Sequence, residues 1–383
     1  MTSKIANLKE EDGKMTFTLS QVDVSYVNGM RRTILSDIPI VVFKTTPYEE
    51  NNADIIINTS RPQLNNEIVK ERLSCIPICI NYLETKPPIQ NYLLELDVEN
   101  KTDTTIIVTT KDFKIRDTVS NKLLDDTDTK KIFPPFIPPN GNGEYYIDFL
   151  RLRPKISDEI PGERIKLTCK FTLGTARDDS MFNVTGTCSY GCTPDYEKME
   201  EQLEIRKQKW KDEDKKEDEI KFEAANWKLL EGMRYVIKNS FDFVIESVGI
   251  YSNEQIIIES CIILLRKMNK LKTLIKQDEM KIKRSDNTLE NCYDILLVNE
   301  DYTVGNILNF ELYKIFYTDL KTIDYVGFKK LHPHDSDSLL RISIIDQTKG
   351  IDTIKAMLLV VIDESIKTLT GIKGCFDGSR NLN

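Results

Sequence analysis

Two stretches with apolar residues at helical spacing constrain the fold of this chain more than any other feature. After Ser252, which forms a capping-box pattern with Gln255, apolar side chains recur at steps of four and three residues over about five helical turns. A second stretch, from about Gly350 to Leu369, carries a similar stripe. A helix with a narrow apolar seam hides it against another helix. We therefore expect these two helices to pack together.

The elements around the two long helices repeat one order. In the first part, a strand over 14–22 and a short helix begun at Asp23 come first, and a strand over 241–248 precedes the long helix. In the last part, a strand over 293–298 and a helix capped by Asp301 or Thr303 are followed by strands over 325–330 and 339–345. Repeated plans of this kind predict two units paired about a pseudo-two-fold axis. The predicted pseudo-dimer interface comprises Ile257, Cys261, Leu264, Met268, Ile354, Leu358, Val361 and Ile362.

The short helices of the two units share a residue pattern. Asn28, Met30 and Ile34 in the first match Asn306, Leu308 and Leu312 in the second. Gly29 lies inside the first of these helices, where glycine costs roughly 1 kcal/mol relative to alanine. Either another backbone comes close to Gly29, or the chain tolerates the cost.

Between the two parts of the first unit, the chain changes character. Short alternating segments predominate, clearest over 164–173, and they are separated by Asn, Asp, Pro and Gly. The predicted fold class is α+β, with two pseudo-symmetric α/β dimerisation units, the first interrupted by a mostly β insertion domain. The expected boundaries are 1–49 and 230–275 for the first unit, 50–200 for the insertion, 201–229 for a charged helical connector, 276–288 for a linker and 289–383 for the second unit.

Composition limits the classes of function. The net charge is −8 and the pI is about 5.2, which disfavours a protein that holds nucleic acid by itself. The chain has two histidines, His332 and His334 in one loop segment, so histidine-based acid–base catalysis has little to build on. No apolar run is long enough for a membrane span, and the first residues lack a secretory pattern. We expect no catalytic residue.

The eight cysteines favour a reduced compartment over a disulfide framework. Cys75 with Cys79 and Cys188 with Cys192 could be two halves of a zinc site, but their three-residue spacing is not that of the usual ligand pairs. Cys75 and Cys79 flank Pro77 in what reads as an apolar strand, so buried thiols are the favoured interpretation. We expect neither a metal nor another cofactor.

Five segments resemble two related groups of transcription proteins. The segment VNGMRRTILSDIP (27–39) resembles the signature helix of the alpha-like RNA polymerase family, which includes bacterial alpha, the third-largest subunit of eukaryotic polymerase II and its archaeal counterpart. The segments NEIVKERLSCIPI (66–78) and FDFVIESVG (241–249) resemble that family's following segment and return strand. The segments NEDYTVGNIL (299–308) and YVGFKKLHP (325–333) resemble a second relative, the eleventh subunit of polymerase II and its own archaeal counterpart.

This resemblance implies a non-catalytic assembly platform. The two relatives are separate chains in cellular polymerases, so one chain carrying both implies an intramolecular pseudo-heterodimer that recruits the two largest catalytic subunits and small subunits, with DNA held only through the complex. A fusion of this kind resembles large double-stranded DNA viruses of eukaryotes. It implies a location in viral factories of the host cytoplasm and in the virion, with the host nucleus as the alternative. The implied contacts to the large subunits are Asn28, Gly29, Arg31, Arg32, Asp37 and Arg72.

Two other classes of function stand against the platform. A stand-alone nucleic-acid-binding module would need a local basic face, and it would bind DNA in a salt-dependent way. A hydrolase or transferase would need a catalytic constellation, for which the sequence shows no nucleotide or metal motif. Both are weaker interpretations than the platform.

Overall fold

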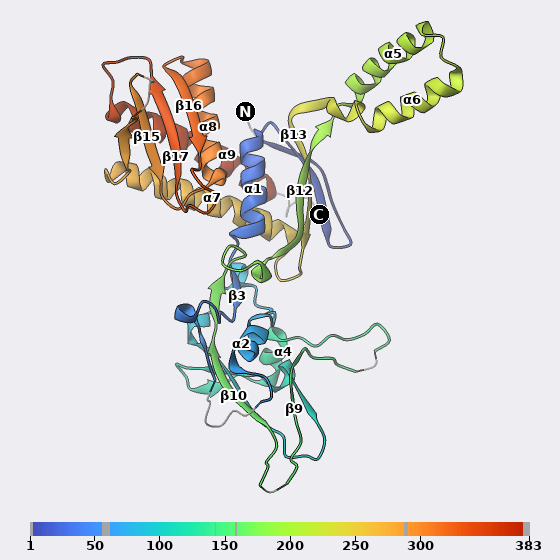
Figure 1. Ribbon diagram of the computed structural model, residues 1–383, viewed down its shortest axis with the longest axis vertical. Coiled ribbons are helices and arrows are strands. Elements are labelled where there is room, and N and C mark those ends of the chain that lie inside the picture. The colour runs from blue at the N-terminus through green and yellow to red at the C-terminus, as the bar shows by residue number, and fades with distance from the viewer. Residues whose placement is uncertain (1–2, 56–61, 142, 158, 287–289, 378–383) are drawn as a thin grey trace. The chain divides into compact units, whose positions relative to one another are not determined.

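The computed structural model describes residues 3–55, 62–141, 143–157, 159–286 and 290–377 (Figure 1). Helices and strands are mixed throughout, which confirms the predicted α+β class. The chain forms two compact units. One comprises Met1–Leu35, Thr185–Ser247 and Ser252–Asn383, and the other comprises Ser36–Val184 and Val248–Tyr251.

The first sheet of unit one is antiparallel, with strand order β1-β2-β13-β12. Its strands are β1 (Lys4–Glu11), β2 (Lys14–Ser20), β13 (Val236–Ser247) and β12 (Thr185–Pro194). Met15, Phe17 and Leu19 of β2 are buried, as the alternation of the sequence predicts. Phe17 stacks on Phe243 of β13 with ring centroids 5.0 Å apart. Phe376 of the last helix contacts the Phe17 ring edge-on, with ring centroids 5.1 Å apart. The end of the last helix of the chain therefore packs against the apolar face of this sheet.

The second sheet of unit one has strand order β14-β15-β17-β16. Its strands are β14 (Ile282–Arg284), β15 (Cys292–Leu297), β17 (Ser338–Ile344) and β16 (Ile323–Lys329). The predicted linker over 276–288 is thus corrected, because it contains β14, whose backbone pairs with β15. Its polar, basic composition concealed a short edge strand. Helix α8 (Tyr302–Leu312) follows β15 and continues into a π-helix over Tyr313–Asp319.

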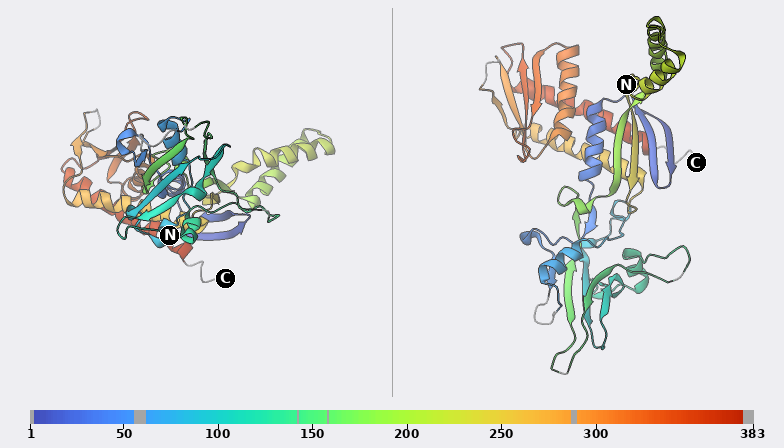
Figure 2. Two further views of the ribbon diagram at one scale, coloured as in Figure 1. Left: turned by 90° about the horizontal axis from the view of Figure 1, so that it is seen from below. Right: turned by 45° about the vertical axis from the view of Figure 1, so that its right-hand side comes forward.

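Two long helices lie beside the sheets of unit one. Helix α7 (Asn253–Lys276) begins at the predicted capping box, in which Ser252 accepts from the Gln255 amide and the Gln255 side chain accepts from the Ser252 amide. Helix α9 (Ile351–Asp377) runs past its predicted end at Leu369. Figures 1 and 2 show α7 and α9 side by side, and the shorter α1 (Val24–Ser36) near α8.

Between β12 and β13 the chain forms a helical hairpin of α5 (Tyr196–Asp212) and α6 (Glu217–Leu229), followed by a 3-10 turn over Gly232–Arg234. The charged segment is therefore two packed helices, where the sequence predicted one solvated connector. The hairpin has a small core of its own, because each helix carries apolar residues on the side that faces the other. Figure 1 shows it projecting from the ends of β12 and β13. Its buried residues are Met199, Leu203, Trp210, Ile220, Ala224 and Trp227.

Unit two is mostly β, with a five-stranded antiparallel sheet in the order β4-β10-β5-β7-β8. These strands are β4 (Ala53–Ile55), β10 (Arg164–Lys170), β5 (Tyr92–Glu99), β7 (Lys114–Asp117) and β8 (Lys122–Leu123). Two strand pairs accompany the sheet, β6 (Ile106–Thr109) with β9 (Asp148–Leu152) and β3 (Ile40–Val42) with β11 (Thr172–Gly174). Its helices are α2 (Asn66–Ser74), α3 (Tyr82–Thr85) and α4 (Asp126–Ile132), with 3-10 turns over Tyr48–Glu50, Ile89–Asn91, Thr110–Asp112 and Ser180–Phe182.

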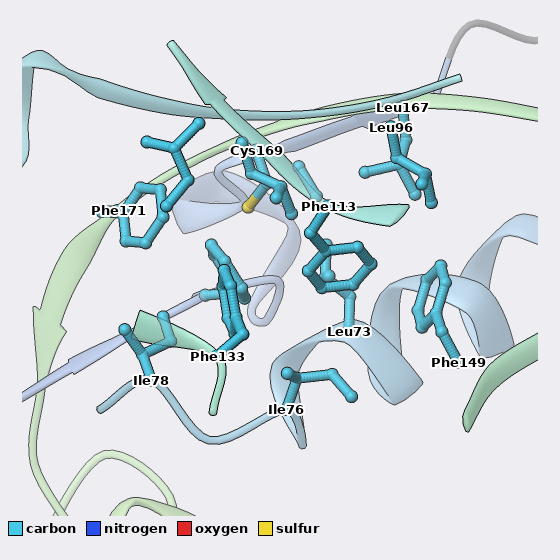
Figure 3. Close-up of a cluster of buried hydrophobic side chains, with 14 of the residues drawn as sticks. Leu73, Ile76, Ile78, Leu96, Phe113, Phe133, Phe149, Leu167, Cys169 and Phe171 are labelled. Carbon is cyan, nitrogen blue, oxygen red and sulfur yellow. The ribbon is translucent and has the colours of Figure 1, made fainter. Parts of the chain in front are cut away.

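The core of unit two is built from aromatic and aliphatic side chains (Figure 3). Phe113 meets Phe133 and Phe149 edge-on, with ring centroids 5.3 and 5.5 Å apart, and Leu73 of α2 joins the same cluster. Apart from Val248–Tyr251, the unit ends at Val184, earlier than the predicted insertion boundary at 200. Strand β12 belongs to the first sheet of unit one because its backbone pairs with β13.

Candidate assembly interface

Helices α1 and α8 approach each other closely at Gly29. A β-carbon at this position would lie 3.1 Å from Cδ1 of Ile307 and 3.7 Å from the Thr303 carbonyl oxygen. The absence of a side chain lets α8 come close to α1, which is a common use of glycine inside a helix. The glycine that the sequence left with two interpretations therefore lies at a helix crossing.

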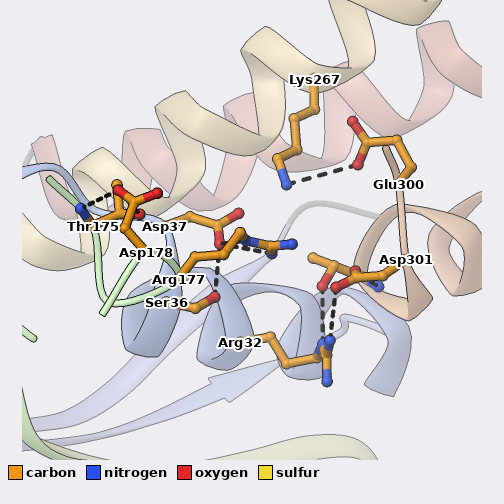
Figure 4. A network of polar contacts seen from close by, with 10 residues as sticks. Arg32, Ser36, Asp37, Thr175, Arg177, Asp178, Lys267, Glu300 and Asp301 are labelled. Carbon is orange, nitrogen blue, oxygen red and sulfur yellow. Dashed lines mark hydrogen bonds and ion pairs between the residues drawn. The ribbon is translucent and has the colours of Figure 1, made fainter. Parts of the chain in front are cut away.

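Polar pairs join the two helices on both sides of Gly29. Before it along α1, the Tyr26 hydroxyl donates to Oε1 of Glu311 at 2.8 Å, and the Tyr26 ring meets Phe310 edge-on. After it, Arg32 donates from Nε to Oγ1 of Thr303 and from Nη2 to Oδ2 of Asp301, each at 2.9 Å (Figure 4). The crossing is thus fixed by apolar contact at its centre and by hydrogen bonds at its ends.

The pair of Tyr26 and Glu311 is buried. Burial first, and then the negative charge of Glu311, raise the pKa of Tyr26 far above its ordinary value, so the hydroxyl keeps its proton and donates. Glu311 also lies 3.5 Å from the Lys314 ammonium group. A carboxylate shielded from water needs such partners to offset its lost hydration.

Asp301 has two roles at the start of α8. Its Oδ1 accepts from the Thr303 amide at 2.9 Å, which caps the helix as the sequence predicted, and its Oδ2 accepts from Arg32. The Arg32 side chain is 34% exposed and that of Asp301 is 11% exposed. Arg32 is therefore engaged within the chain, and its predicted contact with one of the large polymerase subunits stays a prediction.

Arg31 and Asn28 form a pair on the side of α1. The Arg31 Nε donates to Oδ1 of Asn28 at 3.0 Å, and both residues are partly exposed. Burial raises the pKa of the Cys188 thiol in β12 to about 12, and the positive charge of Arg31 partly opposes this rise. The charge of Arg31 therefore acts on a residue of β12, and Arg31 is partly exposed.

The two other predicted partner residues belong to unit two. Arg177 donates from Nε and Nη2 to Oδ1 of Asp37 at 3.0 and 2.8 Å, and the Ser36 hydroxyl donates to the same oxygen (Figure 4). Arg72 donates to the carbonyl oxygens of Phe149 and Asp148 at 2.6 and 3.3 Å, which ties α2 to β9. Both side chains thus have structural partners within the unit.

The predicted seam residues of α7 and α9 are all buried, and the two helices pack on each other. Ion pairs line the edge of this packing. Lys272 pairs with Asp363, and Lys355 pairs with Asp278, so the start of α9 lies near the end of α7 and the helices are antiparallel. Lys267 of α7 lies 3.7 Å from Glu300, just before α8 (Figure 4). The eight seam residues are Ile257, Cys261, Leu264, Met268, Ile354, Leu358, Val361 and Ile362.

The interpretation of the cysteine pairs as buried thiols is wrong for three of the four residues. Cys75, Cys79 and Cys192 are exposed, whereas Cys188 is buried. Cys75 ends helix α2, and the segment around Pro77 is irregular chain, so the alternation argument does not apply there. Among the residues that the structure describes, no group of three or more His, Cys, Asp and Glu side chains is arranged to hold a metal ion.

Sequence reasoning missed Glu311 and the second role of Asp301. Glu311 is a charged residue among the buried positions Val304, Ile307 and Leu308 of α8, and such an interruption of an apolar stripe signals a paired buried charge. The pairing of Arg32 with Asp301 carried no local signal, because the two residues are far apart in the chain.

Comparison with known proteins identifies the family. Residues 16–268 match the model of the RNA polymerase Rpb3/Rpb11 dimerisation domain, a range that covers well over half of the chain and includes most of β2, all of α1 and β13, and most of α7. The chain therefore belongs to this family. In the described part of the chain, no helix has the length and apolar character needed to cross a membrane.

Three relatives are named as polymerase subunits. The chain is 32% identical over 75 residues to the DNA-directed RNA polymerase subunit Rpo3 of Pyrococcus horikoshii, and 24% identical over 197 residues to the DNA-directed RNA polymerases I and III subunit rpac1 of Dictyostelium discoideum. It is 34% identical over 77 residues to the DNA-directed RNA polymerases IV and V subunit 3B of Arabidopsis thaliana. These matches cover 20%, 50% and 20% of this chain, and 26%, 52% and 21% of the relatives.

Proposed function

We propose that this chain is a non-catalytic assembly-platform subunit of a multisubunit DNA-directed RNA polymerase. It forms an intramolecular pseudo-heterodimer that recruits the two largest subunits and small subunits, and it meets DNA only through the complex. Family membership and three relatives named as polymerase subunits support this role.

The observation that carries the pseudo-dimer is the crossing of α1 and α8. When Asn28 is matched with Asn306, Gly29 matches Ile307, and these two residues touch. Two helices related by a two-fold axis must cross at matching positions. The seam residues of the two long helices also fit a two-fold relation. The helices are antiparallel, and their buried residues have the same spacing: Ile257, Cys261 and Leu264 in α7, and Ile354, Leu358 and Val361 in α9.

On this proposal the two halves of unit one correspond to the two chains of a heterodimer. The first half contains the sheet of β1, β2, β13 and β12 with α1 and α7, and residues Ser36–Val184 of unit two form the insertion between α1 and β12. The second half contains the sheet of β14 to β17 with α8 and α9. Joining the halves turns a bimolecular step into an intramolecular one, with an effective concentration of about millimolar through a short connection.

The viral origin belongs to the proposal and rests on the resemblance to fused viral subunits. It places the protein in cytoplasmic factories of the host and in the virion, with the host nucleus as the alternative. Immunogold labelling of infected cells and purified virions tests both locations.

Co-expression of the tagged chain with the remaining polymerase subunits tests the assembly role. We expect the two largest subunits to co-purify with the chain in near-equal amounts. Recovery of the chain alone would contradict the proposal, and salt-dependent DNA binding by that isolated chain would favour a nucleic-acid-binding module instead.

A pair of variants then tests the α1 face. Arg31→Glu reverses a partly exposed charge on α1, and we expect it to lower the recovery of the large subunits at least about tenfold. Lys122→Glu, on the exposed strand β8, is the matched control and should leave recovery unchanged. Equal recovery with both variants would remove Arg31 from the interface.

A further inference from the structure

Helix α6 carries apolar residues on two faces. One face holds Ile220, Ala224 and Trp227, which pack against α5 inside the hairpin. On the opposite side lie Phe222, Ala225 and Leu229, at steps of three and four residues, which we call the outer stripe. A helix of a two-helix hairpin needs only one apolar face to pack, so the outer stripe is not explained by the hairpin fold.

The outer stripe faces solvent. The Phe222 side chain is 67% exposed and that of Leu229 is 76% exposed, and Ala225 is exposed as well. Single exposed apolar residues are ordinary on protein surfaces. Three of them in helical register form the pattern by which an amphipathic helix enters an apolar groove, with anchors at positions i, i+3 and i+7.

The hairpin is held together without the outer stripe. At the edge of its core Trp227 donates from Nε1 to Oε2 of Glu231 at 3.1 Å, and Arg206 donates to the same oxygen at 2.9 Å. Lys228 pairs with Glu200 across the two helices, and the Lys215 ammonium lies 5.8 Å from the centre of the Trp210 ring. The outer stripe is therefore presented on a braced scaffold, which lowers the entropy cost of binding.

Charge indicates what covers the stripe. Residues 211–219, which comprise the end of α5, the turn of the hairpin and the start of α6, contain three lysines and six acidic residues, Asp212, Glu213, Asp214, Glu217, Asp218 and Glu219. Asp218 precedes Phe222 by four residues, so it continues the outer stripe toward the turn. A complementary surface is apolar along the stripe and positively charged at the end that receives the turn.

We propose that the outer stripe of α6 docks into another protein of the polymerase complex. That partner offers an apolar groove with lysine or arginine side chains at the end facing the hairpin turn. This inference rests on the proposed assembly role. It adds a contact made by the α5–α6 hairpin, separate from the α1 face and from the α7–α9 seam.

Site-specific photocrosslinking in the assembled polymerase tests the docking. The photoreactive residue p-benzoylphenylalanine replaces Phe222 in one sample and Ile205 in the control, and both chains are purified through co-expression with the other subunits. Ile205 is 51% exposed on the outer side of α5, so it matches Phe222 in exposure but not in face. We expect the probe at 222 to form an adduct with an apolar residue of another subunit, near basic residues, at least about ten times more often than the probe at 205.

The outcomes separate the docking inference from the assembly role. Co-purification of the two largest subunits without an adduct at 222, or with equal adducts at 222 and 205, would overturn the inference and leave the assembly role intact. An adduct with a second copy of this chain, or with an acidic surface, would also overturn it. Failure of the large subunits to co-purify would remove the assembly role and the inference with it.

Charge and apolar variants give a second measurement. Phe222→Glu combined with Leu229→Glu should reduce protection of α6 from hydrogen exchange in the assembled polymerase to the level of the free chain, whereas Ile205→Glu should leave protection unchanged. Asp218→Lys combined with Glu219→Lys should lower protection and make it less sensitive to salt. Circular dichroism of each purified chain confirms that the hairpin remains folded. Unchanged protection in the Phe222 and Leu229 variant would contradict the docking.

Discussion

At the scale of single residues, glycines allow helices to approach other elements. Because Gly29 has no side chain, Ile307 can pack against α1 at the crossing of α1 and α8. Gly305 in the same way lets the ring of Phe328 pack against α8. A β-carbon at Gly305 would lie 2.0 Å from Cε2 of that ring, so the ring would have to move. Phe328 also meets Tyr302 edge-on, which restricts where it can go.

Gly305→Ala should therefore destabilise the protein. We expect the free energy of unfolding to fall by about 1–3 kcal/mol, because overpacking displaces a packed ring. Urea unfolding monitored by circular dichroism measures the change. Gly374→Ala in α9 is the matched control, since a β-carbon there meets nothing within 4 Å. It should raise stability by up to about 1 kcal/mol through helix propensity, and a loss of stability in both variants would contradict the packing argument.

The pair of Arg32 and Asp301 makes a second prediction at this scale. In a double-mutant cycle with Arg32→Met and Asp301→Asn, we expect a coupling free energy of about 1 kcal/mol, reduced by salt, because the pair is partly exposed. Asparagine retains the helix cap, so the cycle isolates the charge. The exposed pair of Lys14 and Glu246 is the control, with expected coupling near zero. A coupling of zero for both pairs would show that Arg32 does not fix the crossing.

At the scale of elements, ion pairs across strands help set the register of the second sheet. Asp294 of β15 lies opposite Arg341 of β17, and Arg341 donates to its two oxygens at 2.6 and 2.8 Å. These hydrogen bonds lower the pKa of Asp294 below its ordinary value, although burial acts in the opposite direction. The pair joins neighbouring strands by a fork of two bonds, which specifies geometry as well as charge.

The lowered pKa of Asp294 predicts a loss of stability in acid. Because the folded-state pKa lies below the unfolded-state pKa of about 3.9, the stabilisation is complete above that pH and disappears as pH falls through the folded-state value. Asp294→Asn should cost about 1–3 kcal/mol at neutral pH and flatten the stability profile below pH 4. Urea unfolding between about pH 2.5 and 7 measures both effects. Arg341→Gln should also flatten the dependence of the unfolding free energy on pH below about pH 4. An unchanged pH dependence in both variants would contradict the pairing.

At the scale of the whole molecule, unit one depends on the packing of α7 against α9. Each helix buries an apolar face on the other, so neither half has a complete core by itself. The ion pairs at the edge, such as Lys355 with Asp278, add orientation but little stability because their carboxylates are largely exposed. Apolar burial therefore supplies most of the free energy that joins the halves.

Separating the chain between Glu279 and Met280 tests this dependence. Fragments 1–279 and 280–383, when co-expressed, should co-purify in equal amounts, and either fragment expressed alone should aggregate or unfold. Size-exclusion chromatography and circular dichroism distinguish these results. Leu358→Asp in the second fragment should abolish co-purification, whereas the exposed Val360→Asp should preserve it. Two fragments that are each soluble, monomeric and cooperatively folded would contradict the pseudo-dimer.

The sequence by itself determined the local elements of this protein. The alternation of β2, the cap of α8 and the seams of α7 and α9 were all readable, because strand and helix periodicity is a property of neighbouring residues. The α-like motifs were also readable, and the family comparison agrees with them. The sequence patterns gave wrong predictions in two places. The polar, basic composition of β14 did not indicate a strand, and the strand predicted around Pro77 led to the wrong prediction that Cys75 and Cys79 are buried.

Only the tertiary structure decided which distant residues meet. The pairing of Arg32 with Asp301, of Tyr26 with Glu311 and of β12 with β13 joins segments separated by long stretches of chain. Such contacts depend on backbone pairing and on the fit of surfaces, neither of which leaves a periodic signal in one segment. The hairpin of α5 and α6 also depends on the fit of two surfaces. Its mixed charges are typical of a solvated helix, and only the packing of the two inner apolar faces makes it a hairpin with a core.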